Sequence, residues 1–404
     1  MKRDFIWNTL GSLVGGFTFF ILTVFITRLN GIHASGSFGF AFSIAAIFST
    51  IAYYGGRNYQ VTDIKGEFET GDYIGLRLGM SVIAALALII FIAANKFNTT
   101  ITLLIIVLMG YRLLDAVSDV LYGILQIHNR LHQAGKSNFI KSLLSILGFM
   151  AVDYATHSIL LSSLVFIVVF VAGIFVFDIS SIHKINPVKI KFFGNWNIKK
   201  IALKLLPFAL VIFIPIATTN LTKYFIQLWH PVDQGYFNIL IMPLFFLTLI
   251  VYFVVAPFLT RMARTLQERR YVVFKKNINQ ISFFIVGIGT VLLPITYFLG
   301  PIVLKIIFGI DFKHFATQLT LIVISGILYT LAIFYTDILL ILRKVKTELA
   351  ILIVILVINI AISIFLIPRY AINGAIAVSI VTNALWLFAF WLVYYITLRK
   401  KMDK

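Results

Sequence analysis

The segment 100–127 carries charged and polar side chains within an otherwise apolar stretch. Steps of three or four residues separate Arg112, Asp115, Asp119, Tyr122 and Gln126, so a helix places all of them on one stripe. Because a charge at the centre of a bilayer costs about 2.5–3.5 kcal/mol, this stripe cannot face lipid. It therefore either lines an aqueous cavity, where its charged groups could bind ions, or packs on a polar neighbouring helix.

Two interpretations of these charges stay open. Arg112 and Asp115 lie at i and i+3, where they can form an internal ion pair and largely neutralise each other. Asp119 has no obvious cation close to it in the sequence, which favours a water-filled cavity beside the helix.

Two further cations lie near the ends of polar-rich apolar stretches. Arg28 follows Asn8 in the first stretch, and Lys223 lies between Asn220 and Gln227 in a later one. If both point inward, they form a cationic patch that suits an anionic substrate, particularly a phosphate or pyrophosphate. The alternative is that each extends to the membrane interface.

Three carboxylates are candidates for ion coupling, namely Asp115, Asp119 and Asp337. Asp337 is the most isolated of them, and partial burial would favour its protonated form, as proton coupling requires. The alternative for Asp337 is an ion pair with Arg343 at the end of the same helix.

Membrane-spanning helices must position these groups. The chain has 404 residues, of which 60% are hydrophobic, and its mean hydropathy is +1.00. Helices are expected because a bilayer offers the backbone no hydrogen-bond partner and the apolar runs are too long for barrel strands. The expected spans are 5–28, 37–56, 73–95, 100–127, 137–156, 159–178, 204–228, 235–259, 278–300, 316–342, 348–367 and 372–398.

The spans predict an all-α polytopic membrane protein, with about 12 transmembrane helices in two six-helix bundles around a central cavity. Residues 1–178 form the N-terminal bundle and residues 204–404 the C-terminal bundle. Residues 179–203 join them as a basic cytoplasmic connector. Its mixture of Lys with Ile, Phe and Trp suits an amphipathic segment on an anionic leaflet, although a solvated linker is an alternative.

The basic residues segregate if the spans alternate in direction. The chain has 34 Lys and Arg residues against 15 Asp and Glu, and most of the basic residues fall on the side of both termini. The other side receives Arg28, Lys96, Lys305, Lys313 and Arg369. This asymmetry predicts a multi-pass protein of the cytoplasmic (inner) membrane with both termini in the cytoplasm, and the family resemblance described below implies a bacterial one. Since the basic residues are spread over all the cytoplasmic connections, nucleic acid is not an expected partner.

Several site chemistries are not expected. The chain has no Cys, which excludes disulfides and thiolate metal sites. "AGKS" at 134–137 resembles the end of a phosphate-binding loop, but Arg130 stands where that loop needs glycine. His128 and His132 have no evident third metal ligand. We therefore expect no cofactor, no metal and, without a nucleophile–His–acid set, no enzyme activity.

An internal repeat is suggested by "FITRLNGIHASGSFGFAF" and "NLTKYFIQLWHPVDQGYFNI", in which Gly39 aligns with Gly235 and Arg28 with the neighbourhood of Lys223. Parallel six-span repeats are a known plan of transporters, with the substrate path between the halves.

Three segments resemble the Wzx-type flippases, the bacterial polysaccharide transporters of the multidrug/oligosaccharidyl-lipid/polysaccharide exporter superfamily. They are "TRLNGIHASGSFGFAFSIAAIFSTIAYYGGRNYQVTD", "VSDVLYGILQIHNRLHQAGKS" and "IVLKIIFGIDFKHFATQLTLIVIS". The resemblance implies two bundles that rock around a cationic cavity and flip an undecaprenyl-pyrophosphate-linked oligosaccharide. Arg28 and Arg57 occupy places comparable to cavity arginines of related lipid II flippases, although Arg57 could belong to the cytoplasmic gate. Asn30 and Lys223 depart from the simplest pattern.

The resulting hypothesis is a flippase for surface polysaccharide synthesis, whether of capsule, O-antigen or exopolysaccharide. The residues expected to receive pyrophosphate and sugars are Arg28, Arg57, Arg112, Lys223, Asn8, Asn220, Gln227 and Tyr122. The expected partners are the lipid-linked oligosaccharide and membrane lipids, with a polysaccharide polymerase and a chain-length regulator as further candidates. The rivals are a multidrug or small-solute exporter, a facilitator and a membrane glycosyl polymerase. The excess of buried cations argues against the first and short outer loops against the last.

Overall fold

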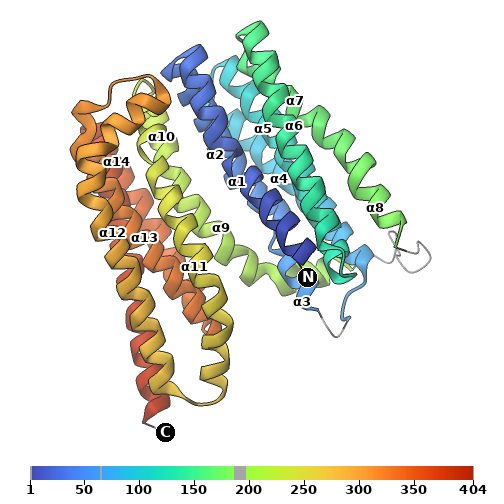
Figure 1. Ribbon diagram of the computed structural model, residues 1–404, viewed down its shortest axis with the longest axis vertical. Coiled ribbons are helices and arrows are strands. Elements are labelled where there is room, and N and C mark those ends of the chain that lie inside the picture. The colour runs from blue at the N-terminus through green and yellow to red at the C-terminus, as the bar shows by residue number, and fades with distance from the viewer. Residues whose placement is uncertain (1, 64–65, 186–196, 404) are drawn as a thin grey trace. The chain divides into compact units, whose positions relative to one another are not determined.

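The computed structural model describes residues 2–63, 66–185 and 197–403. Within these ranges the regular structure is entirely helical, and ten helices are long and apolar enough to cross a membrane (Figure 1). The predicted all-α fold class is therefore confirmed, and the chain is a multi-pass membrane protein.

The chain divides into two compact units, Met1–Ile216 and Ala217–Lys404. The division falls inside helix α9 (Ile198–Trp229), so the first part of this helix belongs to the N-terminal unit. Of the predicted connector 179–203, residues 186–196 lie outside the described ranges.

The N-terminal unit contains the first six predicted spans. Its helices are α1 (Lys2–Asn30), α2 (Ile32–Tyr53), α3 (Gly56–Thr62), α4 (Thr70–Asn95), α5 (Thr99–Ile127), α6 (Leu131–Thr156), α7 (Ile159–Gly173) and α8 (Ser180–His183). A π-helical segment, η1 (Ile174–Ile179), joins α7 to α8 without a break in the backbone. Such π-helical turns are rare and often occur at functional sites.

Helices α1 and α6 pack closely because small residues lie at their contact. A Cβ atom on Gly135 would come within 2.4 Å of the carbonyl carbon of Trp7, and one on Gly11 within 2.5 Å of the carbonyl oxygen of Gly135. Contacts this short allow only glycine, the residue that lets membrane helices approach closely. The Asn138 side chain donates a hydrogen bond to the Gly11 carbonyl at 3.0 Å across the same contact.

The C-terminal unit contains the rest of α9, with α10 (Gln234–Leu240), α11 (Met242–Gln267), α12 (Tyr271–Phe308), the short 3₁₀ helix η3 (Lys313–Phe315), α13 (Ala316–Ile341) and α14 (Val345–Met402). Helix α14 has 58 residues and contains two predicted spans, 348–367 and 372–398. Ala371, with φ 47° and ψ −124°, separates them, three residues after Pro368. The two predicted spans are therefore two helices on either side of a kink at Ala371.

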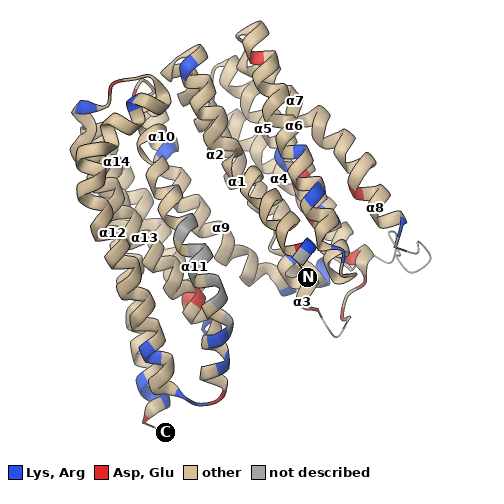
Figure 2. Cartoon of the chain, viewed as in Figure 1, with Lys and Arg blue, Asp and Glu red and all other residues tan. Residues whose placement is uncertain are grey.

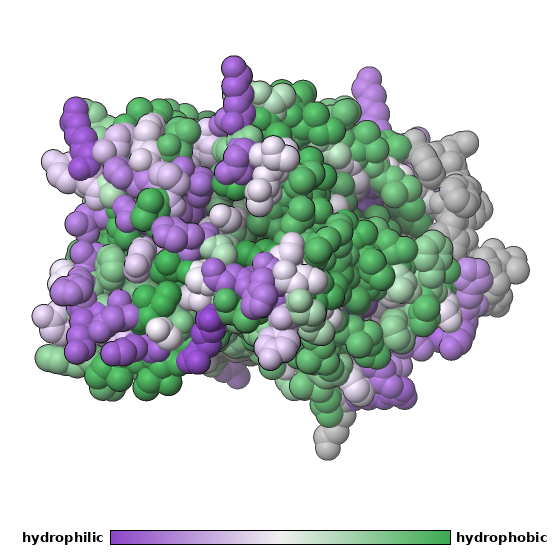
Figure 3. Space-filling model, turned by 90° about the horizontal axis from the view of Figure 1, so that it is seen from above, coloured by the Kyte–Doolittle hydropathy of each residue, from purple (hydrophilic) through white to green (hydrophobic). Residues whose placement is uncertain are grey.

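The side chains on the surface fit a bilayer environment. Large apolar residues lie exposed on the helices, among them Ile90, Val168 and Phe283, which is 75% exposed. Apolar side chains (green) make up much of the surface in Figure 3. In the C-terminal unit, basic side chains gather at the α11–α12 turn and near the C-terminus (Figure 2). Apolar sides with basic helix ends are the pattern that membrane helices require.

Candidate functional site

In the N-terminal unit, one carboxylate joins three helices. Asp119 on α5 accepts from Arg57 of α3 at 3.3 Å and from Arg77 of α4 at 2.7 Å. A second nitrogen of Arg57 donates to the Gln126 side chain, two turns further along α5, at 3.0 Å. The Tyr122 ring lies 5.8 Å from the Arg57 guanidinium. The polar stripe predicted on the fourth span therefore exists, and its partners come from α3 and α4.

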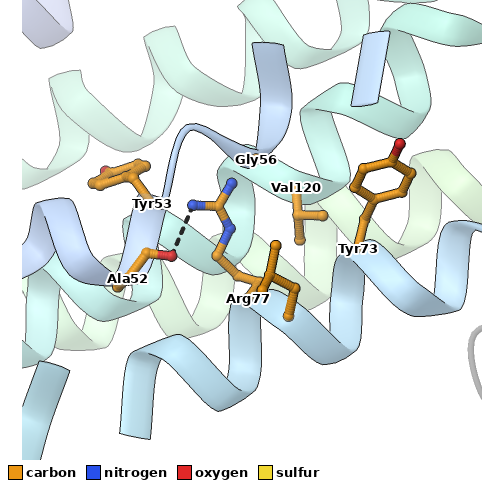
Figure 4. A pocket seen from close by; sticks show the side chains of 7 residues that line it. Ala52, Tyr53, Gly56, Tyr73, Arg77 and Val120 are labelled. Atoms are coloured by element: carbon orange, nitrogen blue, oxygen red, sulfur yellow. Dashed lines mark hydrogen bonds between the residues drawn. The ribbon is translucent and has the colours of Figure 1, made fainter. Parts of the chain in front are cut away.

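Arg77 is the most deeply placed of these cations, with 2% of its side chain exposed. Figure 4 shows its guanidinium reaching from α4 to the end of α2, where it donates to the Ala52 carbonyl at 3.1 Å. The Tyr53 ring lies 5.3 Å from the same group. A Cβ on Gly56 would lie 3.5 Å from an Arg77 nitrogen, so the backbone of the α2–α3 turn passes close to the guanidinium. The residues at the α2–α3 turn thus hold the Arg77 guanidinium in position.

The other half of the stripe holds a second pair. Asp115 accepts a hydrogen bond from the Tyr53 hydroxyl and lies 4.0 Å from Arg112. The Arg112 guanidinium stacks on the Phe42 ring at 4.5 Å, and its Nε has no hydrogen-bond partner among the described residues. The i, i+3 interpretation of Arg112 and Asp115 therefore holds, although the pair is long.

We call Arg57, Arg77, Arg112, Asp115 and Asp119 the arginine cluster. It carries three guanidinium groups against two carboxylates, which leaves an excess of positive charge. Arg57 and Arg112 are 26% and 22% exposed, so both retain N–H groups that an incoming ligand can reach. Guanidinium groups bind phosphate oxygens in a bidentate manner. The cluster is therefore equipped to bind an anion that displaces an internal carboxylate.

A second polar network lies deeper in the same unit. Lys141 of α6 is fully buried and donates to Asp178 at 2.8 Å and to Ser118 at 2.7 Å. Asp178 lies in the π-helical segment and also accepts from Ser137. Gly173 makes room for this pair, because a Cβ there would come within 2.3 Å of the Lys141 side chain.

The Tyr122 side chain connects the two networks. It is 6% exposed and donates to Ser137 at 3.3 Å, and its ring centre lies 5.8 Å from the Arg57 guanidinium and 5.0 Å from the Lys141 ammonium. Tyr122 was predicted to bind substrate. In the structure Tyr122 is buried, and its ring contacts Arg57 of the arginine cluster.

The other predicted site residues lie elsewhere. Arg28 is exposed in the last turn of α1, and Asn8 lies where α1 packs against α6. Lys223, Asn220 and Gln227 belong to the part of α9 in the C-terminal unit, where Lys223 is 8% exposed. Asp337 on α13 is half-buried in that unit. Of the predicted site residues, the structure therefore brings together five: Arg57, Arg112, Asp115, Asp119 and Tyr122.

Asp119 has no cation close to it in the sequence, and its two cations come from the helices α3 and α4. Asp337 has no cation within ion-pair distance among the described residues, so the alternative of a pair with Arg343 does not hold. Arg77 and Lys141 lie at the starts of the predicted spans 73–95 and 137–156 and were not among the predicted site residues, and both are buried within helices. Their apolar flanks, "YIGLRLGMSV" and "FIKSLLSIL", were the available signal.

A loop outside the spans fixes the entry to α4. Partial burial acts to raise the pKa of Asp63, but N–H groups of Glu67 and Phe68 and the Tyr73 hydroxyl donate to its carboxylate and bring the pKa below its ordinary value. A hydrogen bond from Lys204 of α9 likewise lowers the pKa of Glu67. These contacts attach the start of α9 to the α3–α4 loop.

No protein-family model matches the chain. The capsular polysaccharide biosynthesis protein CapF of Staphylococcus aureus is 22% identical over 398 residues, which are 98% of this chain and 99% of that protein. An inward-facing multidrug resistance MATE family transporter of the MOP superfamily superposes with a TM-score of 0.71 over 99% of each chain, at 13% identity. A mutant of the Vibrio cholerae MATE transporter VcmN gives a TM-score of 0.64 at 16% identity, over 99% of this chain and 97% of that one.

The chain has the fold of the MOP superfamily. The agreement extends over nearly the full length of both transporters. The family resemblance expected from the sequence is therefore confirmed at the level of fold. Among the described residues, no group of three or more His, Asp or Glu side chains could hold a metal ion within this MOP-type fold.

Proposed function

We propose that this protein is a flippase that moves an undecaprenyl-pyrophosphate-linked oligosaccharide across the cytoplasmic membrane for surface polysaccharide synthesis. The observation that carries the proposal is the arginine cluster, with its excess of guanidinium over carboxylate on one face of α5. The near full-length similarity to a capsular polysaccharide biosynthesis protein supports the polysaccharide pathway.

In this mechanism Asp119 acts as an internal counter-ion. Without substrate it neutralises Arg57 and Arg77 and holds both side chains in position. A pyrophosphate would displace it from Arg57, which is the more exposed of the two and makes the longer contact with Asp119. Arg77 stays hydrogen-bonded to the Ala52 carbonyl and holds Asp119 in position. Asp119 can therefore pair with Arg57 again after the substrate has left. Recognition therefore exchanges one anion for another and avoids an uncompensated buried charge.

The remaining parts of the proposal follow the chemistry of the substrate. Arg28, Lys223, Asn8, Asn220 and Gln227 are its further candidate contacts to pyrophosphate and sugars. The lipid tail stays in the bilayer during transport. Membrane lipids, a polysaccharide polymerase and a chain-length regulator are the proposed partners, and both termini lie in the cytoplasm.

A multidrug exporter is the alternative, because multidrug transporters share this fold. An exporter of organic cations requires an acidic or aromatic site, and the arginine cluster disfavours such ligands.

The test is transport in proteoliposomes that contain the purified protein. A fluorescent undecaprenyl-pyrophosphate oligosaccharide and a cationic dye are offered in parallel, with imposed proton or sodium gradients. We expect protein-dependent flipping of the lipid-linked oligosaccharide and no accumulation of the dye. Transport of the dye without flipping would replace the proposal with the exporter function.

A further inference from the structure

The C-terminal unit contains a carboxylate whose position requires an explanation. Glu348 lies in the first turn of α14 and is fully buried, and both of its carboxylate oxygens are without a hydrogen-bond partner among the described residues. An isolated buried carboxylate is so costly that such a group normally takes up a proton or a cation. The structure therefore points to a ligand at this place.

A second carboxylate lies close to it. The turn between α13 and α14 is short: the Arg343 N–H bonds to the Leu340 carbonyl at 3.0 Å, and the Lys344 N–H to the Leu339 carbonyl at 2.9 Å. This turn brings Asp337, near the end of α13, into electrostatic contact with Glu348. Asp337 is only half-buried, so this second carboxylate reaches the surface of the unit.

Cations from the surrounding helices do not neutralise this pair. The antiparallel topology brings the end of α11, the start of α12 and the start of α14 to the same end of the unit as Asp337. The end of α14 returns to the same place. Most of the cations at this end are exposed, and none forms an ion pair with either carboxylate among the described residues: Arg261, Arg264, Lys275, Lys276, Arg343, Lys344, Lys346, Arg399 and Lys400, with Lys401 half-buried. The phenols of Tyr335 and Tyr394 lie on α13 and α14, with ring centres 5.5 Å apart, and are neutral at pH 7.

A proton fits this site better than a metal ion. A hard metal cation takes about six or more oxygen ligands, and no group of three or more acidic or His side chains exists among the described residues. Two neighbouring carboxylates in an apolar environment instead share one proton, because both cannot remain charged.

We propose that Asp337 and Glu348 form a proton-binding site and that this proton drives transport. Glu348 holds the proton, and Asp337 passes it to and from solvent. The site drives the cycle if its affinity for the proton differs between the inward and outward states. The coupling role rests on the proposed transport function, whereas the proton site does not.

The first experiment needs no substrate. The infrared carbonyl signal of protonated carboxyl groups is followed against pH in purified protein in lipid nanodiscs. We expect a signal at pH 7 in the wild type that disappears in alkali. Glu348→Gln should remove it, and Glu268→Gln, at an exposed position on the α11–α12 turn, should leave it unchanged. Asp337→Asn removes a like charge, so the Glu348 signal should titrate at a lower pH than in the wild type.

Absence of the signal at pH 7 in the wild type would overturn the proton site, whether or not the variants fold. Retention of the signal in folded Glu348→Gln would do the same. The coupling role is tested by flipping in proteoliposomes with and without a pH gradient. We expect the gradient to accelerate the wild type and Glu268→Gln but not Glu348→Gln. A wild type without any flipping would refute the transport function and the coupling role, while the infrared result still decides the proton site.

Discussion

The two units differ in whether their buried carboxylates have partners. In the N-terminal unit, Asp178 pairs with Lys141 at 2.8 Å and Asp119 with Arg77 at 2.7 Å. In the C-terminal unit, Glu348 is as deeply buried as Asp178 but has no partner among the described residues. Paired charges fix the geometry of helices and leave the surplus arginines available to an anion. Unpaired carboxylates can change their protonation state, so we assign recognition to the first unit and coupling to the second.

Removing Lys141 should leave a buried carboxylate without a partner in the N-terminal unit, as Glu348 is in the C-terminal unit. We expect this change to have the largest effect on stability. Lys141→Met leaves Asp178 buried without its cation, which we expect to lower the free energy of unfolding by about 3–5 kcal/mol. The measurement is thermal or denaturant unfolding in detergent. Lys199→Met, at an exposed position on α9, is the control.

The double variant Lys141→Met/Asp178→Leu separates loss of pairing from loss of packing. Since replacing a whole buried ion pair by apolar groups is often neutral, most of the stability should return. A double variant as unstable as Lys141→Met alone would contradict the assignment of this cost to unpaired charge.

A smaller disturbance of the same pair should follow from Gly173→Ala. The added Cβ would meet the Lys141 side chain at 2.3 Å, and both members of the pair are held in place. We expect a loss of about 1–3 kcal/mol, as in other overpacked sites. Gly16→Ala on α1 meets nothing within 4 Å and serves as the control, with no loss expected. Equal stability of both variants would show that Lys141 can move freely.

Outside the membrane spans, both units contain a loop carboxylate that accepts hydrogen bonds. The expected effect of its protonation on stability is the smallest of those considered. A hydrogen bond from the Lys313 N–H lowers the pKa of Asp311 in the C-terminal unit, and hydrogen bonds lower that of Asp63 against its partial burial. A lowered carboxylate pKa stabilises the folded loop above the unfolded-state pKa, and this stability is lost as pH falls through the folded value.

Acidification should therefore reduce hydrogen-exchange protection of the Phe68 and Lys313 N–H groups in the wild type. Asp63→Asn should abolish the pH dependence at Phe68 and Asp311→Asn that at Lys313. A pH dependence that survives both substitutions would assign it to other groups.

The helices could be predicted from the sequence because hydropathy and span length fix them locally. The stripe on α5 and the Arg112–Asp115 pair also depend on helical spacing alone. The partners of Asp119 could not be predicted, since Arg57 and Arg77 lie 62 and 42 residues away and only helix packing brings them together. Glu348 was overlooked because it lies among polar residues at a helix start, where exposure is the usual outcome.

The central claim is that Arg57 in the arginine cluster binds the pyrophosphate of a lipid-linked oligosaccharide. The most direct measurement is the affinity of purified wild type, Arg57→Gln and the exposed control Arg264→Gln for undecaprenyl-pyrophosphate oligosaccharide in nanodiscs. A charge-assisted hydrogen bond contributes about 1.5–3 kcal/mol, so Arg57→Gln should bind about tenfold or more weakly, and Arg264→Gln like the wild type. Equal affinity of all three proteins would contradict the account.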